Sequence, residues 1–477
     1  MKLEKINIQN YRCFSSYEIE FTSGVNVLIG KNGVGKTTII NAIKHGLSFV
    51  FAKTEPSDNQ QSIATSAEGL TVEKFDLMDA LYDETIEDYR YPIAIQCHAS
   101  SLPQWEIYKE SAAGRILWTK YKEAHQVFED KKYLPILAIY SDSYPHLESA
   151  LSTYAKKILS SGHIIPKNFG YYQWGAESSC AEVWEQRFIN LWEDIKDKRT
   201  ALQNYSGTTA SLTITVGEII KDSTKENSQE ATKTKLFNEL LHLERERETI
   251  TNFLINFSNP ISTISTLDQF KIQGLEVSRK KYLNVRFVDG RSVLFQNLPA
   301  GYKRLFSIVL DIAYRAYILQ LRGIGELLPI SLKNPEEVTG IVVIDEIDLH
   351  LHPSLEQEII ERLQNTFPNI QFIVSTHSNL VIANLKENEG KNSIIKLDCI
   401  AGKYTNQKLP NLFGIGYEAC LSDFMGTPPR NSDVKYLAEA YIRLEKRQEV
   451  EQAQFMRDEL IKLVGNENVT KIIDSFR

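Results

Sequence analysis

The sequence predicts an α/β protein built around a largely parallel sheet, and three widely spaced segments carry that prediction. Residues 25–29, 341–344 and 372–374 are short, largely apolar runs, each followed at once by glycine or polar residues. Consecutive apolar residues are typical of strands that are buried on both faces of a parallel sheet. Ligands of such open sheets bind at the carboxyl ends of the strands, so we expect a site where the three polar stretches meet.

The first run opens onto a glycine-rich loop. Residues 30–37 read GKNGVGKT, and residues 38–47, TIINAIKHGL, have the apolar spacing of a helix. Strand, glycine loop and helix in this order form the context of a phosphate-binding loop, in which backbone N–H groups and the helix N-terminus face phosphate oxygens. The alternative is a glycine turn that binds nothing.

Each position of this phosphate loop (residues 30–37) has an expected role. Lys36 is expected to reach the β- and γ-phosphates of a nucleotide, and the Thr37 hydroxyl is expected to ligate Mg²⁺. Further nucleotide contacts are expected from Asn32, Gly33, Val34, Gly35 and Thr38.

The other two runs end in candidate catalytic residues. Asp345 and Glu346 follow the second run, and we expect Asp345 to complete the Mg²⁺ shell while Glu346 polarises an attacking water. His377 follows the third run and is a candidate sensor of the γ-phosphate. A histidine after a strand is more often structural, so this role depends on the two other motifs.

At these residues a family becomes recognisable. The chain resembles the ABC-type ATPases related to RecF, Rad50 and SMC proteins, in the branch that bacteria use in phage-defence systems. Residues 5–21, KINIQNYRCFSSYEIEF, match the N-terminal strand and the Asn-(Phe/Tyr)-Arg-x-Phe element of that family. The resemblance implies a two-lobed ATPase head with a mixed, mostly parallel sheet and with ATP and Mg²⁺ as cofactors. It makes Arg12 a candidate ATP contact; the alternative for Arg12 is an exposed turn residue.

Such ATPases bind ATP between two heads, and each head completes the other's site with a loop of the form Leu-Ser-x-Gly-(Gln/Glu). The matching segment here is LPAGYKRLFSIVLDIAYRAY, residues 298–317. Gly301 is retained, whereas Pro299 replaces the serine that contacts the γ-phosphate. We expect Ala300, Gly301 and Lys303 to contact the partner's ATP, with Lys303 or Arg304 supplying the missing charge. The departure bears on the rate of hydrolysis more than on ATP binding.

The resemblance also divides the chain into four segments. These are a first lobe with an antiparallel β-subdomain (1–144), a helical insertion (145–265), a second lobe (266–405) and a C-terminal helical hairpin (406–477). The insertion is too short for the long coiled coils of SMC and Rad50 proteins. The hairpin, with helices near 431–447 and 449–464, is expected to serve assembly or partner docking; the alternative is that it packs on its own head.

Composition agrees with a cytoplasmic protein that does not enter a membrane. The chain lacks an apolar run near the roughly 20 residues that span a bilayer, and because a strand pattern begins at once we expect no signal peptide. Its five cysteines are scattered without a C-x-x-C pair, which argues against disulfides and structural zinc. A net charge of −7 disfavours indiscriminate nucleic-acid binding. The basic stretch 278–286 leaves DNA as a partner, with the solvated face of a hairpin as the alternative.

The resemblance implies a function that involves a second protein. About 100 residues follow His377, and neither an acidic cluster like that of the nuclease in related enzymes nor an HNH motif is found in the sequence. We therefore expect an ATPase subunit that forms head-to-head dimers or larger even-numbered oligomers and regulates a separate nuclease. The ATPases of Septu systems, whose partner is an HNH nuclease, are one such group. The alternatives are a RecF-like DNA-binding repair ATPase and a nucleotide-gated scaffold with little turnover.

Overall fold

The protein is described by a computed structural model that divides into two compact units, Met1–Phe413 and Gly414–Arg477. The predicted segments 1–144, 145–265 and 266–405 all lie in the first unit. The residues described are 1–51, 73–114, 116–119, 124, 134–141, 151–160, 165–175, 181–206, 228–259, 261, 270–321 and 337–476.

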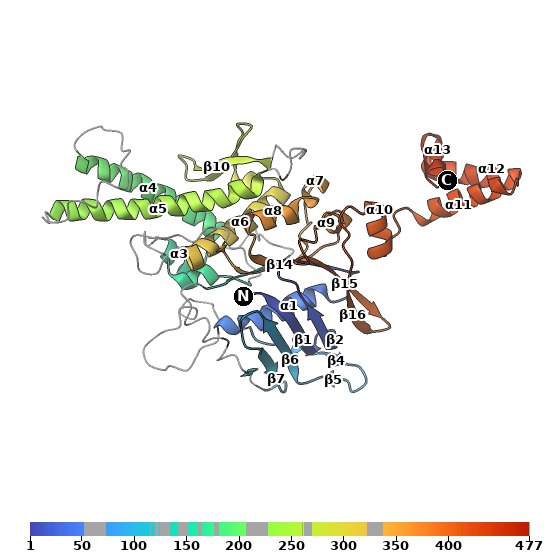
Figure 1. Cartoon of the computed structure of the whole chain (residues 1–477), viewed down its shortest axis with the longest axis horizontal. Helices are drawn as coiled ribbons and strands as arrows, with labels where there is room; N and C mark the ends of the chain where they lie inside the picture. Colours follow the sequence, from blue (N-terminus) through green and yellow to red (C-terminus); the bar gives the residue numbers. More distant parts are fainter. Residues whose placement is uncertain are drawn as a thin grey trace. The chain divides into compact units, whose positions relative to one another are not determined.

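The first unit is organised around a six-stranded sheet in the order β16-β15-β3-β14-β13-β9 (Figure 1). Every adjacent pair from β15 to β9 is parallel, and β16 runs antiparallel at one edge. The three apolar runs of the sequence are the adjacent strands β3, β14 and β13, all of whose residues are buried. The predicted α/β fold with a mostly parallel sheet is therefore confirmed. The strands are β3 (Val25–Ile29), β9 (Ile136–Tyr140), β13 (Gly340–Ile344), β14 (Ile370–Ser375), β15 (Ser393–Ile400) and β16 (Lys403–Lys408).

A second, antiparallel sheet has the order β2-β1-β6-β7-β8. Helix α1 (Lys36–Leu47) packs against this sheet, and Figure 1 shows it between the two sheets. The Trp105 indole N–H donates to the Gly46 carbonyl at 2.7 Å, which anchors the end of α1 to β7. The strands are β1 (Leu3–Tyr11), β2 (Phe14–Glu20), β6 (Ile93–Ala99), β7 (Trp105–Lys109) and β8 (Ile116–Thr119).

Helices cover the other side of the parallel sheet. Helix α6 (Ala300–Ala316) packs on β9, and α8 (Ile359–Thr366) packs on α5 (Ser228–Ser258), which in turn contacts a small antiparallel sheet. That sheet is formed by β10 (Ile272–Val277), β11 (Leu283–Phe287) and β12 (Ser292–Leu294). The other short α-helices and strands described in this unit are α3 (Thr153–Ser160), α7 (Pro353–Glu356), α9 (Asn379–Ala383), β4 (Tyr82–Asp83) and β5 (Asp88–Tyr89).

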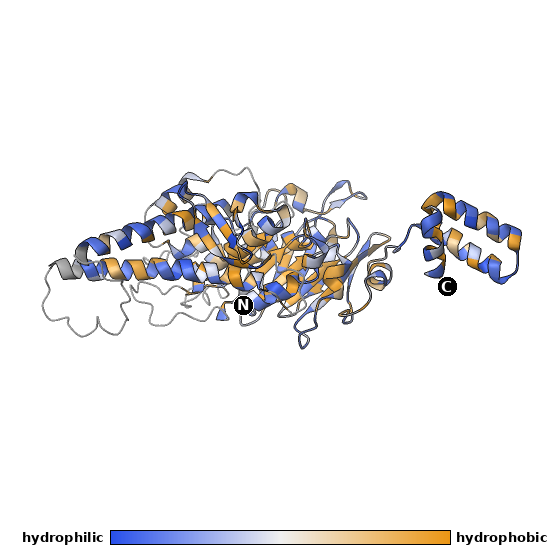
Figure 2. Cartoon of the chain, turned by 90° about the horizontal axis from the view of Figure 1, so that it is seen from above, coloured by the Kyte–Doolittle hydropathy of each residue, from blue (hydrophilic) through white to orange (hydrophobic). Residues whose placement is uncertain are grey.

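Two long helices, α4 (Ala181–Ser206) and α5, run side by side as an arm (Figure 1). Near its root the buried Arg187 and Glu246 form a bidentate ion pair, with N–O distances of 2.7 and 2.7 Å. Leu191, Ile195 and Leu243 form a small apolar core beside this pair. Hydrophilic residues alternate with fewer hydrophobic ones along the arm, whereas hydrophobic residues concentrate in the sheets and in the helices that cover them (Figure 2).

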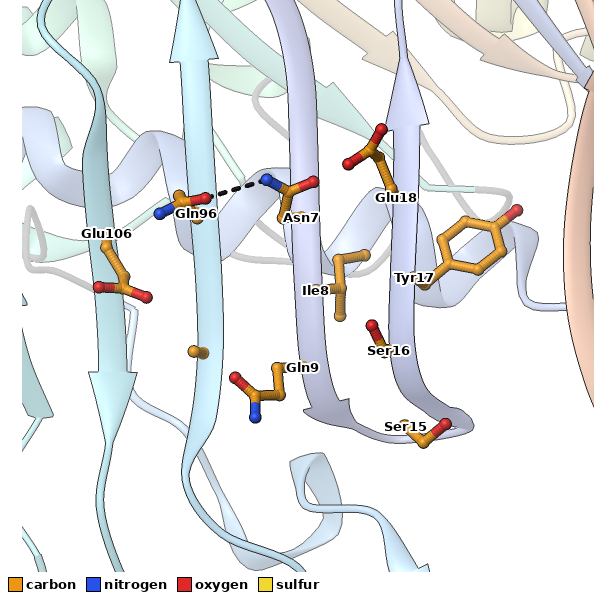
Figure 3. Close-up of a pocket in the computed structure, with 10 residues that line it drawn as sticks. Asn7, Ile8, Gln9, Ser15, Ser16, Tyr17, Glu18, Gln96 and Glu106 are labelled. Carbon is orange, nitrogen blue, oxygen red and sulfur yellow. Dashed lines mark hydrogen bonds between the residues drawn. The ribbon is translucent and has the colours of Figure 1, made fainter.

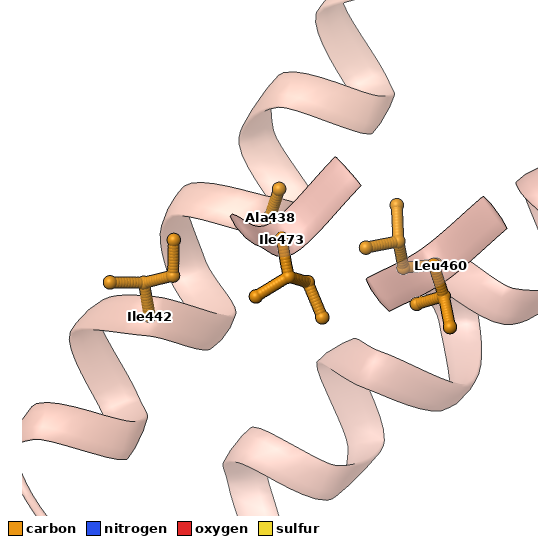
Figure 4. Packing of buried hydrophobic residues seen from close by; sticks show 5 residues of the cluster. Ala438, Ile442, Leu460 and Ile473 are labelled. Carbon is orange, nitrogen blue, oxygen red and sulfur yellow. The ribbon is translucent and has the colours of Figure 1, made fainter. Parts of the chain in front are cut away.

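The second unit is a helical bundle with its own core. Its helices are α10 (Tyr417–Ala419), α11 (Ser432–Lys446), α12 (Val450–Val464) and α13 (Asn466–Asp474). The Asn431 side chain caps α11 by accepting from the N–H groups of Asp433 and Val434. Ala438, Ile442, Leu460, Val469 and Ile473 make up the buried core (Figure 4).

The predicted hairpin of α11 and α12 is present, and α13 is an addition that the sequence analysis missed. The sequence predicts one apolar face from Tyr436, Leu437, Tyr441 and Leu444 and another from Phe455, Leu460 and Leu463. Three of these residues differ, because Tyr436, Phe455 and Leu463 are 67%, 59% and 58% exposed. Leu437 and Tyr441, also predicted for the first face, are partly buried against the core of the bundle. No helix in the described residues is long and apolar enough to cross a membrane.

Candidate functional site

The phosphate loop leaves β3 and enters α1 through glycines at left-handed backbone angles. Gly33 and Gly35 have φ angles of 83° and 95°. Gly35 needs to be a glycine for a second reason, since a Cβ there would lie 2.5 Å from Phe14 Cζ. The Phe14 ring stacks on Tyr17 with ring centroids 4.2 Å apart and meets Tyr404 edge-on. Phe14, the aromatic residue that ends the Asn-(Phe/Tyr)-Arg-x-Phe element, therefore packs directly against the phosphate loop at Gly35.

Lys36 folds back over the loop. Its ammonium group donates to the carbonyls of Gly30 and Lys31 at 2.6 and 3.1 Å. Burial lowers the pKa of Lys36, and the negative charges of Asp345, Glu346 and Asp348 oppose that shift. The loop lysine therefore lies close enough to the carboxylates after β13 to interact with their charges, as the two halves of a nucleotide site must.

Asp345 joins the loop to the end of β13. The Thr37 hydroxyl donates to Asp345 Oδ2 at 3.3 Å, and the Ser375 hydroxyl at the end of β14 donates to Asp345 Oδ1. The Thr37 hydroxyl at the start of α1 and the Asp345 carboxylate after β13 supply the hard oxygen ligands that Mg²⁺ prefers, so these residues fit a Mg²⁺ ion. The structure brings together the two residues that the sequence analysis assigned to this metal.

Glu346 is partly buried, and its backbone is held on both sides. Its φ angle of 48° is in the left-handed region, its N–H donates to Ser375 Oγ at 2.8 Å, and its carbonyl accepts from Arg304 at 2.7 Å. His377, two residues beyond β14, is exposed. The residue before it, Thr376, donates to Asp348 at 2.6 Å.

The other candidate nucleotide contacts have different surroundings. Asn32, Gly33 and Thr37 are exposed, whereas Val34 is buried and Thr38 is partly buried.

Arg12 occupies the turn between β1 and β2 with a φ angle of 50°, and its Nε donates to Asp79 Oδ1 at 2.9 Å. A backbone bond from the Arg12 N–H to the Asp79 carbonyl, 2.8 Å long, reinforces this pairing. The turn is therefore fixed against the segment 76–80.

The signature-like segment at the start of α6 is divided between buried and accessible residues. Gly301 is buried, and a Cβ there would lie 2.5 Å from the His350 carbonyl oxygen. Ala300 is exposed, and the Lys303 ammonium group faces the Gln296 carbonyl at 3.5 Å. The sequence predicts that Lys303 or Arg304 supplies a charge to a partner's ATP, and for Arg304 the structure differs. Its guanidinium is 2% exposed and is bound to the chain's own backbone after β9 and β13.

Three residues that the sequence analysis did not assign also shape the site. Phe14 supports Gly35, Ser375 bridges Asp345 and Glu346, and Asp348 binds Thr376 beside His377. Asp348 had a usable signal, since it follows Asp345 by three residues in a loop that starts at a strand end. The bridging role of Ser375 depends on the pairing of β13 with β14, which a single sequence does not reveal.

A separate groove of about 380 Å³ lies on the outer face of the antiparallel sheet (Figure 3). Most of its lining side chains are polar, and Asn7 Nδ2 donates to Gln96 Oε1 at 2.9 Å. None of the candidate ATP-site residues lines it. The lining residues are Asn7, Ile8, Gln9, Ser15, Ser16, Tyr17, Glu18, Ala94, Gln96 and Glu106.

Comparison with known families agrees with this geometry. Residues 1–382 match the family model described as an AAA ATPase domain. The chain belongs to this ATPase family. Membership places the phosphate loop and the end of β13 in an ATP-binding domain, and the chain is related to the RecF and Rad50 ATPases as the resemblance implied.

Two retron ATPases match most of this AAA ATPase. The Retron Vc95 probable ATPase of Vibrio cholerae is 27% identical over 417 residues, which cover 82% of this chain and 73% of that protein. The Retron Ec83 probable ATPase of Escherichia coli is 27% identical over 79% of this chain and 69% of that protein. The Septu protein PtuA of Bacillus mycoides is 32% identical, but only over 35% of this chain and 24% of its own length.

The solved structures that are similar to this chain include SMC head domains. The SMC head domain from Thermotoga maritima covers 86% of this chain and 100% of its own chain, with 12% identity and a TM-score of 0.39.

Proposed function

We propose that this AAA ATPase binds and hydrolyses ATP as a subunit of a bacterial anti-phage defence system. The observation that carries the proposal is the hydrogen bond from Thr37 to Asp345, which connects the phosphate loop to the acidic residues that follow β13. The relation to retron and Septu ATPases supports the defence context, and the retron proteins match much more of the chain than PtuA does.

Each residue of the site has a proposed task. Lys36 and the loop N–H groups hold the β- and γ-phosphates, while Thr37 and Asp345 hold Mg²⁺, which when bound neutralises charge on the phosphates. The Glu346 carboxylate orients the attacking water and accepts its proton. His377, exposed beside this carboxylate's loop, donates a hydrogen bond to the γ-phosphate.

We propose that two heads pair around ATP, in a dimer or a larger even-numbered oligomer. Exposed Ala300 and accessible Lys303 at the start of α6 support this arrangement, because these side chains are available to another protein. A separate nuclease, of HNH type if the system is like Septu, is the proposed effector that ATP controls.

The test combines defence and co-purification. The tagged chain is expressed with its neighbouring genes, as wild type, as Lys36→Ala and as Glu346→Gln. We expect phage plaques to fall at least about tenfold with the wild type and to be restored by Lys36→Ala, since the loop lysine holds the phosphates. Wild type and Glu346→Gln should co-elute with a nuclease. Unchanged plaque counts for Lys36→Ala, at equal protein levels, would contradict an ATP-dependent defence role.

A second candidate function is DNA binding, as in RecF-like repair. The turn between β10 and β11 carries the exposed residues Arg279, Lys280 and Lys281 beside Tyr282, which is 50% exposed. Cationic side chains next to an exposed aromatic ring suit phosphate contact and base stacking. A chain that co-purifies with DNA but with no nuclease, and loses DNA affinity in Arg279→Gln/Lys280→Gln, would favour this function.

A further inference from the structure

The buried guanidinium of Arg304 joins α6 to the residues that carry the proposed chemistry. Its Nη1 donates to the Glu346 carbonyl at 2.7 Å, and its Nη2 donates to the carbonyls of Asp345 at 2.7 Å and of Ser141 at 3.3 Å. Ser141 directly follows β9, and Asp345 directly follows β13. One side chain therefore binds the carboxyl ends of two adjacent parallel strands.

Such an arrangement has a physical reason. A buried cation is unfavourable unless polar groups satisfy it, and here backbone carbonyls at two strand ends do so. The planar guanidinium sends several N–H groups in fixed directions, so it can hold neighbouring carbonyls in a defined relative orientation. A lysine would offer a compact charge without this fixed fork.

Glu346 needs this support because its backbone is in an uncommon conformation. A non-glycine residue at a φ angle of 48° persists when the surroundings hold it there. Ser375 binds the Glu346 N–H at 2.8 Å, and Arg304 binds the Glu346 carbonyl. The two peptide groups that flank the Glu346 Cα are thus both fixed, which sets the direction in which the carboxylate leaves the backbone.

The start of α6 is itself docked on the same loop. Gly301 packs against the His350 carbonyl so closely that a Cβ would collide with it. Gly301 and Arg304 lie one turn apart on α6 and contact the loop after β13 at two points. Gly301 packs against His350, and Arg304 donates to Glu346. The same helix carries the exposed Ala300 of the signature-like segment.

We propose that Arg304 is a positioning residue for Glu346, acting within its own chain. It touches no ATP and sets the orientation of the Glu346 carboxylate through the backbone. This inference rests on the proposed hydrolysis of ATP, and it replaces the expectation that Arg304 reaches into the site of a partner.

The experiment compares two buried arginines of α6. Arg315 is as buried as Arg304, but it binds Asp311 and the carbonyls of Gly170 and Tyr172 instead of the acidic strand end. For Arg304→Met we expect kcat for phosphate release to fall at least about tenfold, with the Kd for ATP changed less than about threefold, because misplacing a reacting group chiefly affects the chemical step. Arg315→Met should lower Tm and leave kcat per folded protein unchanged. Equal losses of kcat in both variants would overturn the proposal.

A double-mutant cycle keeps the test valid if either methionine variant fails to fold. Arg304→Lys should lower kcat in the wild-type background and have no further effect in Glu346→Gln, since residues that act through one another are not additive. An additive loss would assign Arg304 another role. If the wild type releases no phosphate beyond Glu346→Gln, the proposed hydrolysis itself is wrong. Normal turnover in Arg304→Lys and Arg304→Met, with Glu346→Gln inactive, would refute only the positioning role.

Discussion

The two parts of the proposed ATP site differ in how completely one chain builds them. Lys36, Thr37 and Asp345 have hydrogen-bond partners on adjacent strands and loops, and Lys36 and Asp345 are buried. Ala300 is exposed and Lys303 is partly exposed at the start of α6. The first part, called the internal part below, is fixed by the core of the fold. The second, the external part, consists of side chains whose proposed ligand belongs to a paired head.

The largest expected effect concerns the internal part. Glu346→Gln should reduce phosphate release at least about 100-fold while ATP binding persists, because loss of a general base removes proton transfer but not phosphate contacts. Turnover and nucleotide affinity are measured on the same sample, with Lys36→Ala as the variant that loses binding. Wild type that is already as inactive as Glu346→Gln would instead indicate a nucleotide-gated scaffold.

Mixing two inactive variants tests whether the external part acts on another chain. Lys36→Ala disables the internal part, and Ala300→Glu places a negative charge on the exposed external part. Each variant alone should be inactive, whereas an equal mixture should recover about a quarter of wild-type turnover, because half of the randomly formed dimers contain one intact composite site. Each variant mixed with wild type serves as the control. No recovery in re-equilibrated mixtures would mean that each chain completes its own site.

The second unit should contribute to neither part. Leu460 is fully buried in the core of this unit, so Leu460→Ala should destabilise the unit by about 2–5 kcal/mol and lower its unfolding temperature. In the full-length Leu460→Ala variant, the rate of ATP hydrolysis by the first unit should be unchanged when it is measured below the unfolding temperature of the second unit. The matched control is Leu463→Ala, because Leu463 in the same helix is 58% exposed. A loss of turnover in Leu460→Ala alone would tie the second unit to the site.

A smaller, pH-dependent effect is expected at the root of the arm beside Lys303. Burial, with the nearby Glu182 charge, raises the pKa of Glu185 to about 7, and Lys303 and Gln296 oppose the shift. Because the folded state holds this proton more tightly than the unfolded state, the stability it contributes is present below about pH 4.5 and lost as pH rises through about 7.

The variant that removes this titration is Glu185→Gln. It should be more stable than wild type by about 1–3 kcal/mol at pH 8 and nearly equal to it at pH 4. Denaturant unfolding at both pH values measures the difference, with Glu182→Gln as the less buried control. A stability difference that does not change with pH would show that Glu185 is not held protonated near neutrality.

The sequence predicted the parts of this molecule that depend on local patterns. The phosphate loop and the strands β3, β13 and β14 each follow from short stretches of residues, and the parallel sheet follows from their apolar runs. The in-chain role of Arg304 could not be predicted, because its partners are backbone carbonyls 41 and 42 residues away that no side-chain pattern marks.

The C-terminal bundle shows a second limit. Helix α13 has only nine residues, and Gly465, with a φ angle of 81°, separates it from α12. A nine-residue amphipathic stretch carries few apolar repeats, so its periodicity is weak evidence for a helix. The faces of α11 and α12 were partly misassigned for a related reason: several apolar residues lie on both sides of each helix, and the packing of three helices decides which are buried.

The arm has a mechanical consequence. Its root is held by the buried Arg187–Glu246 pair, and α4 continues from Arg187 for a further 19 residues to Ser206, a length of about 28 Å. A rigid rod of this length acts as a lever, so a rotation of about 10° at the root would displace Ser206 by about 5 Å. A fluorophore near the outer end of α4 would therefore magnify movements in the head that are too small to follow at the ATP site itself.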